Sequence, residues 1–186
     1  MANKEALTAF HQEAIAEVAD RLFLEKGFQA TSRDDIAREA DYSKATLYVY
    51  FKSKEQIHHY ILLKAMRLLY ERIQAGLASS PDALEQYWAI CREFQAYSAK
   101  HPTYYQALSE TIATDQKSRD RDPLLQSIYE VGEQVNEVTQ EALDNGVRQG
   151  YFRELPQVSA GMLYGSMITS AIQLAGNKVE YLSLII

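Results

Sequence analysis

Lysines and hydroxyl-bearing side chains gather in residues 42–54, "YSKATLYVYFKSK". Lys44, Lys52 and Lys54 lie in this stretch without any acidic residue, although the whole chain has a formal net charge of −6. Ammonium groups attract phosphate oxygens, and Lys, Thr and Tyr donate hydrogen bonds to phosphates and to base edges. The stretch therefore has the chemistry of a nucleic-acid contact, because local charge matters more than the total.

Two short helices separated by a sharp turn are expected to position these side chains. Thr31 or Ser32 can cap a first helix that ends near Ala40, and Ser43 can cap a second one. Asp41 stands at the turn, where its short polar side chain tolerates a left-handed backbone. Helices this short are marginal in water, so they must pack on neighbouring helices.

The second short helix is expected to have an inward and an outward face. Leu47 and Phe51, one helical turn apart, form the inward face. The residues left pointing outward are Lys44, Ala45, Thr46, Val49 and Tyr50. This pattern fits a helix-turn-helix whose second helix enters the DNA major groove. On geometry alone it fits equally well a corner between two helices with a solvated face.

The remaining chain has the periodicity of an all-α protein with short connections. Apolar residues at helical spacing from Ile15 predict a helix that stops at Gly27, and Ser53 with Gln56 forms a capping box opening a helix to about residue 77. Further helices are expected to begin at Ser80-Pro81, at Tyr104-Tyr105, at Asp122-Pro123 with a stop near Gly150, and at Pro156.

Residues 14–57 contain three pieces, "LFLEKGFQATS", "DDIAREA" and "SKATLYVYFKSKE", in a particular order and spacing. In these pieces the segment resembles the N-terminal domain of the tetracycline-repressor (TetR) family of transcriptional regulators. Two positions depart from the family's pattern: Asp41 stands where Gly is usual in the turn, and Ala45 where Gly is frequent. Both departures bear on which bases are read, and Ala45 could touch a thymine methyl group.

The resemblance implies a set of DNA contacts. Its members are Thr31, Arg33, Ser43, Lys44, Ala45, Thr46, Tyr48, Val49, Tyr50 and Lys54. Those that resemble the family's phosphate contacts are Thr31, Arg33, Tyr48, Tyr50 and Lys54, and those where base edges are read are Lys44, Ala45, Thr46 and Val49. Tyr48 could instead be a core aromatic beside Leu47.

The resemblance also implies a three-helix helix-turn-helix domain in residues 1–55 and a helical effector-binding and dimerisation domain in residues 56–186. Aromatic residues in the second domain could line an apolar effector pocket or simply belong to the core; they are Trp88, Phe94, Tyr97, Tyr105 and Tyr129. Small residues on the last predicted helix allow close approach of a partner helix, which suggests a homodimer seam at Gly161, Gly165 and Thr169. Beyond it, "NKVEYLSLII" leaves room for at most a short final helix.

Two other function classes fit parts of the sequence less well. Glu55 and His59 could form a metal-ligand pair, but no HExxH, GxSxG or P-loop pattern occurs, and the lone Cys91 lies among apolar residues. No enzyme activity, cofactor or metal is therefore expected. A helical protein-interaction adaptor that only resembles a helix-turn-helix remains an alternative. The sequence lacks a signal peptide and a membrane span, which predicts a cytoplasmic protein with operator DNA and an unknown small-molecule effector as partners.

Overall fold

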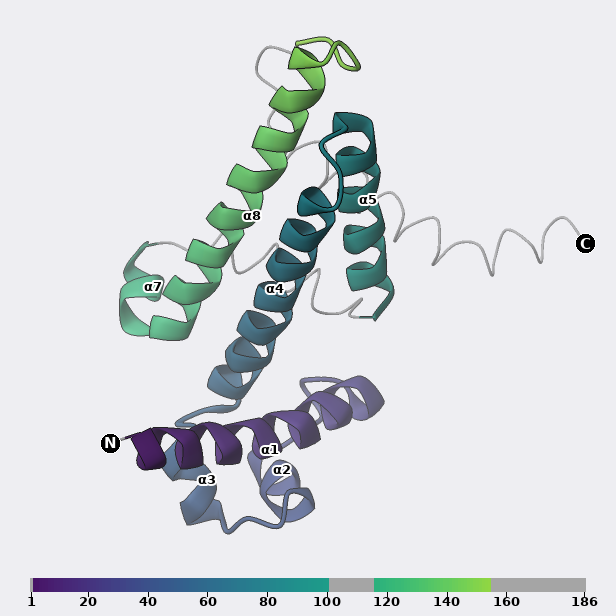
Figure 1. Ribbon diagram of the computed structural model, residues 1–186. Helices are drawn as coiled ribbons and strands as arrows, with labels where there is room; N and C mark the ends of the chain where they lie inside the picture. Colours follow the sequence, from purple (N-terminus) through teal and green to yellow (C-terminus); the bar gives the residue numbers. More distant parts are fainter. Residues whose placement is uncertain (1, 101–115, 155–186) are drawn as a thin grey trace, which may run out of the picture.

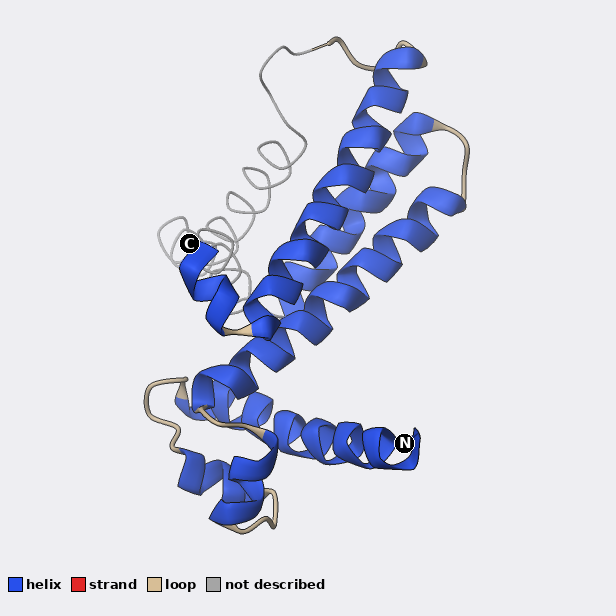
Figure 2. Cartoon of the chain, turned by 90° about the vertical axis from the view of Figure 1, so that its left-hand side faces the viewer, coloured by secondary structure: helices blue, strands red, loops and turns tan. Residues whose placement is uncertain are grey.

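The computed structural model describes residues 2–100 and 116–154, and in these ranges all regular structure is helical (Figures 1 and 2). The helices are α1 (Ala2–Lys26), α2 (Arg33–Glu39), α3 (Lys44–Tyr50), α4 (Lys54–Ala78), α5 (Ala83–Lys100), α7 (Gln116–Arg121) and α8 (Pro123–Arg148). The predicted all-α class is confirmed. The helices expected from Tyr104 and from Pro156 lie outside the described residues.

The two short helices form where local signals predict them. Ser32, rather than Thr31, caps α2, because its hydroxyl accepts from the Asp35 N–H and Asp35 accepts in return from the Ser32 N–H. Asp41 has a φ of 58°, so the expected left-handed turn is confirmed. Ser43 caps α3 by accepting from the N–H of Thr46 at 3.0 Å.

Helix α4 joins the small N-terminal helices to the rest of the fold. It rises from the end of α3 to pack between α5 and α8, and α1 lies across its lower end (Figure 1). Ser53 caps it as expected, with its hydroxyl accepting from the Gln56 N–H at 3.1 Å. The return bond of the capping box is displaced by one residue, because Gln56 accepts from the N–H of Lys52 instead of Ser53.

The prediction for the start of α5 was wrong by two residues. Asp82, not Ser80, is the cap, since its carboxylate accepts from the N–H groups of Leu84 and Glu85, both at 3.0 Å. Ser80 instead accepts from the Asp82 N–H and holds the turn before the helix. A carboxylate two residues downstream of a serine offers the stronger acceptor to the free N–H groups of the helix.

The start and stop of α8 agree with the sequence. Asp122 accepts from the Leu124 N–H at 3.0 Å, Pro123 occupies the first turn, and Gly150 follows the helix with a φ of 79°. The side chain of Gln149 donates to the carbonyl of Pro81, which ties the end of α8 to the turn before α5. The far end of the bundle is thus closed by hydrogen bonds between α8 and that turn.

A single cluster of buried side chains runs through the described helices α1–α5 and α8. Ile15 and Ile57 are fully buried near one end, and Ile90 and Ile128 farther along the same cluster. Helix α4, which begins at Lys54, packs on α1 and also on α5 and α8. None of the helices in the described ranges has the length and apolarity needed to cross a lipid bilayer.

Candidate nucleic-acid interface

Helix α3 has one face in the core and the other open to solvent. Leu47 and Phe51 are 1% and 2% exposed, which confirms the inward face. On the other side Val49 is 77% and Tyr48 49% exposed, and Ala45 is exposed as well. An apolar side chain as exposed as that of Val49 contributes little to the core and is available to a partner. The exposure of Tyr48 also rules out its alternative as a core aromatic.

The first turn of α3 is held by hydroxyl groups. Ser43 Oγ lies 2.7 Å from Thr46 Oγ1, in addition to the bond from the Thr46 N–H. The turn before it is fixed by the N–H of Tyr42, which donates to the carbonyl of Ala37 at 2.9 Å. These bonds fix the orientation of α3 relative to α2, and with it the direction in which the exposed face points.

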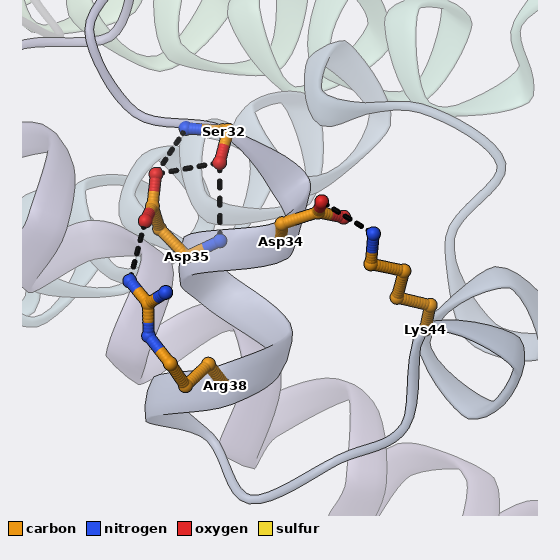
Figure 3. A network of polar contacts seen from close by, with 5 residues as sticks. All are labelled: Ser32, Asp34, Asp35, Arg38 and Lys44. Atoms are coloured by element: carbon orange, nitrogen blue, oxygen red, sulfur yellow. Dashed lines mark hydrogen bonds and ion pairs between the residues drawn. The ribbon is translucent and has the colours of Figure 1, made fainter.

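Lys44 is paired with a carboxylate from the neighbouring helix. Its Nζ lies 2.5 Å from Oδ2 of Asp34, and the two side chains point toward one another across the space between α2 and α3 (Figure 3). Asp35, next in sequence, points the other way, to Ser32 and Arg38. Hydrogen bonds from Ser32 and Arg38 lower the pKa of Asp35 to about 2. Asp34 therefore pairs with Lys44 of α3, whereas Asp35 bonds within its own helix and cap.

Arg33 connects the start of α2 with the exposed face of α3. Its guanidinium carbon lies 4.3 Å from the centre of the Tyr48 ring, and Nη1 donates to the carbonyl of Lys52 at 2.8 Å. Stacking on an aromatic face and one backbone bond leave most of the five donors of a guanidinium for other partners. Arg33 and Tyr48, predicted as separate phosphate contacts, thus form one unit.

Thr31 has a structural environment that the sequence did not reveal. The residue is 1% exposed, and its hydroxyl donates to the carbonyls of Gly27, at 2.9 Å, and Leu22, at 3.2 Å. A phosphate contact through this hydroxyl, as the resemblance implied, is at odds with its burial. The side chain instead fixes the end of α1 to the start of α2.

Lys54 also differs from its expected position. Its ammonium donates to the carbonyls of Phe28, at 2.6 Å, and Thr31, at 2.9 Å, and lies 4.2 Å from the centre of the Phe28 ring. The group is half-buried under the connection between α1 and α2 rather than free at the surface. Two of its three donors are used inside the protein, so the prediction of a plain phosphate contact is incomplete.

An aromatic group behind α3 includes a residue that the sequence analysis missed. Tyr50 is half-buried, and its ring centre lies 5.0 Å from that of His11 on α1. The Nδ1 atom of His11 in turn lies 2.6 Å from the hydroxyl of Tyr42. Histidine at position 11 gave no local signal, because its partners are more than 30 residues away in sequence.

The histidine, cysteine and carboxylate side chains in the described part of the chain bear on whether it could hold a metal or a reactive thiol. There, no three His, Cys, Asp or Glu side chains come close enough together to hold a metal ion. His59 Nδ1 lies 2.8 Å from Oδ2 of Asp122, across from α4 to the cap of α8. Cys91 is half-buried, and this burial raises the pKa of its thiol, which disfavours the reactive thiolate.

The predicted pocket residues that the structure describes lie in different surroundings. Trp88 is 52% exposed on α5, and Phe94 is partly buried against the core. Tyr97 is 7% exposed and borders a hollow of about 90 Å³ between α4 and α5, where burial raises its pKa. Tyr129 lies under Arg119, whose guanidinium carbon is 4.0 Å from the ring centre. Tyr105 lies outside the described residues, as does the predicted seam at Gly161, Gly165 and Thr169.

The arrangement of α1–α3 can be compared with known proteins. Residues 15–61 match the family model of the bacterial regulatory proteins of the tetR family. These residues thus form an N-terminal domain of the TetR type. The match and the relatives support a DNA-binding transcriptional regulator, and the resemblance found in the sequence is confirmed.

Several known proteins are similar to this chain over most of its length. The transcriptional repressor KstR2 of Mycobacterium tuberculosis is 26% identical over 153 residues, which are 81% of this chain and 72% of the relative. The solved structure of the TetR-family regulator PfmR from Thermus thermophilus is 28% identical, with a TM-score of 0.67 over 86% of this chain and 84% of that one. A TetR/AcrR-family regulator from Thermobifida fusca is 26% identical, with a TM-score of 0.65 over 88% and 82%. All three are named as transcriptional regulators.

Proposed function

We propose that the protein binds a palindromic operator as a homodimer, with α3 of each subunit in the major groove. The observation that carries the proposal is the division of α3 into a buried face and an exposed one that combines Lys44, Ala45 and Val49. Such a face offers a donor for guanine and two apolar groups for thymine methyl groups. An operator with two-fold symmetry matches a symmetric dimer, with half-sites one helical turn of DNA apart or a multiple of it.

The proposed DNA contacts fall into two groups, those to base edges and those to phosphates. Lys44, Ala45 and Val49, with Thr46 beside them, are assigned to base edges. Arg33 and Tyr48 are assigned to phosphates together, because the guanidinium stacks on the ring and keeps donors to spare.

The remaining predicted contacts support the interface in other ways. Ser43 orients α3 through its cap, and Tyr50 packs behind the helix. Lys54 acts mainly by holding the α1–α2 connection, through its bonds to the carbonyls of Phe28 and Thr31. Thr31 fixes the same connection from inside, since its hydroxyl is buried.

Regulation is assigned to the part of the chain from about residue 56 onward. An effector would act by favouring a conformation in which the two α3 helices are spaced wrongly for adjacent half-sites. Helix α4 supports this, since it is continuous from its cap at Ser53 into the bundle with α5 and α8. Repression, with release by a small molecule, is proposed from the relatives that are named repressors.

Selection from random duplexes tests the proposal. Bound sequences should enrich a palindrome, and footprinting should protect two half-sites on one face of the DNA. Sedimentation of the free protein at micromolar concentration should give a dimer, and its binding should weaken steeply with salt. Compounds are then screened for release of the selected duplex. A monomer with no enriched palindrome and no salt-dependent shift would instead support the protein-interaction adaptor.

A further inference from the structure

The cation of the recognition helix is already engaged in the free protein. Lys44 is the only Lys or Arg in α3, "KATLYVY". Its Nζ lies 2.5 Å from Asp34 Oδ2, and the side chains are 67% and 57% exposed (Figure 3). The pair therefore lies at the surface that the proposed function assigns to DNA, where any duplex must compete with the Asp34 carboxylate for the ammonium.

We infer that Asp34 is a specificity-determining residue, which withholds Lys44 from phosphates and leaves it available to guanine. The inference rests on the proposed function. If Lys44 leaves Asp34 for a phosphate, one exposed ion pair replaces another. The net gain in binding free energy is therefore small. Guanine offers two acceptors, O6 and N7, inside a groove where other contacts of the correct sequence also form. Only on a matching sequence do these additional contacts compensate for breaking the ion pair between Lys44 and Asp34.

The neighbouring charges make Asp34 the relevant group. Asp35 is held by the Ser32 cap and by Arg38, whose Nη2 lies 2.6 Å from Asp35 Oδ1. Arg33, on the other side of Asp34 in sequence, is turned to Tyr48 and the carbonyl of Lys52. Asp34 lies in the first turn of α2, the helix that crosses the DNA backbone in a helix-turn-helix, so its carboxylate also repels phosphates.

The test compares Asp34→Asn with the unchanged protein on two duplexes, the selected operator and a scrambled version. The variant should bind the scrambled duplex about three- to tenfold more tightly, with a salt slope steeper by about 0.9 per bound recognition helix, because Lys44 becomes a phosphate contact. The operator should gain less, so the ratio of the two affinities should fall about threefold.

A matched control is Asp41→Asn. It removes one negative charge from the same domain, and asparagine tolerates the left-handed backbone of this turn, where φ is 58°. This control should change the affinity for both duplexes by the same factor and leave their ratio unaltered. Thermal unfolding of both variants checks that each is folded.

A double variant shows whether Asp34 acts through Lys44. In a Lys44→Ala background, Asp34→Asn should have only the small, sequence-independent effect of Asp41→Asn, so the fall in the affinity ratio should vanish. An equal gain on operator and scrambled duplex from Asp34→Asn with Lys44 intact would overturn the inference while leaving the operator established. Failure to enrich any operator would overturn the proposed function itself.

Discussion

The position of Lys54 gives the sharpest test of how the DNA-binding helices are held together. Its ammonium donates to the carbonyls of Phe28 and Thr31 and stacks on the Phe28 ring at 4.2 Å. Hydrogen bonds from a charged donor contribute about 1.5–3 kcal/mol each, and an exposed cation–π contact about 0.5–1 kcal/mol. Because the ammonium is half-buried and partly solvated, we expect Lys54→Ala to lower the free energy of unfolding by about 2–3 kcal/mol.

Urea denaturation followed by circular dichroism measures this loss, and the melting temperature should fall by roughly 4–10 °C. Lys52→Ala is the matched control. It removes the same charge from the same basic stretch, but the Lys52 side chain is exposed and only its backbone groups are bonded, to Arg33 and Gln56. Its stability should stay within about 0.5 kcal/mol of the unchanged protein.

Hydrogen exchange locates the effect. In Lys54→Ala the amide of Thr31, which donates to the carbonyl of Phe28, should exchange faster, whereas Lys52→Ala should leave it unchanged. If Lys54→Ala unfolded at the same urea concentration as Lys52→Ala, the ammonium would not hold the α1–α2 connection. Lys54 would then be the simple phosphate contact that the sequence suggested.

Three further outcomes are expected. Val49→Ser should leave stability unchanged, since the residue is 77% exposed, and should weaken operator binding several-fold without affecting a scrambled duplex, as measured by fluorescence anisotropy. Burial lowers the pKa of His58 from 6.5 to about 4, so the unfolded chain binds the proton more readily and stability falls as the pH drops through this window. Between pH 7.5 and 5.5 the loss should be about 1 kcal/mol, and His58→Phe, which keeps a ring against Phe28, should remove it from urea titrations at the two pH values. A Cβ on Gly146 would overlap the Phe152 ring, so Gly146→Ala should cost about 1–3 kcal/mol in the same assay, and Phe152→Ala in addition should relieve the overlap.

The helix caps and the sharp turn could be predicted from the sequence. The caps at Ser43 and Ser53, the left-handed turn at Asp41 and the start of α8 at Asp122 all appear where they were predicted. Each of these features depends on bonds between residues two to four positions apart, so a short stretch of sequence contains the whole determinant. The error at Ser80 arose within the same range, where two nearby side chains compete for the same N–H groups.

The sequence also predicted which face of α3 is buried. Leu47 and Phe51 face the core because they are one turn apart on a helix too short to be stable alone. The family resemblance then gave the function class, since three pieces in a fixed order are far more specific than the periodicity. Neither signal contains the orientation of side chains that reach across to another helix.

Those orientations were decided by the tertiary structure alone. Thr31 lies inside because its hydroxyl donates to the carbonyls of Leu22, in the last turns of α1, and of Gly27, directly after the helix. Lys54 reaches back 26 residues to Phe28, and Lys44 meets Asp34 only because the turn sets α2 beside α3. In sequence all three are polar residues near a helix start, equally suited to phosphate; which of them remain free for DNA depends on the acceptors that helix packing brings within about 3 Å, and no local pattern encodes that.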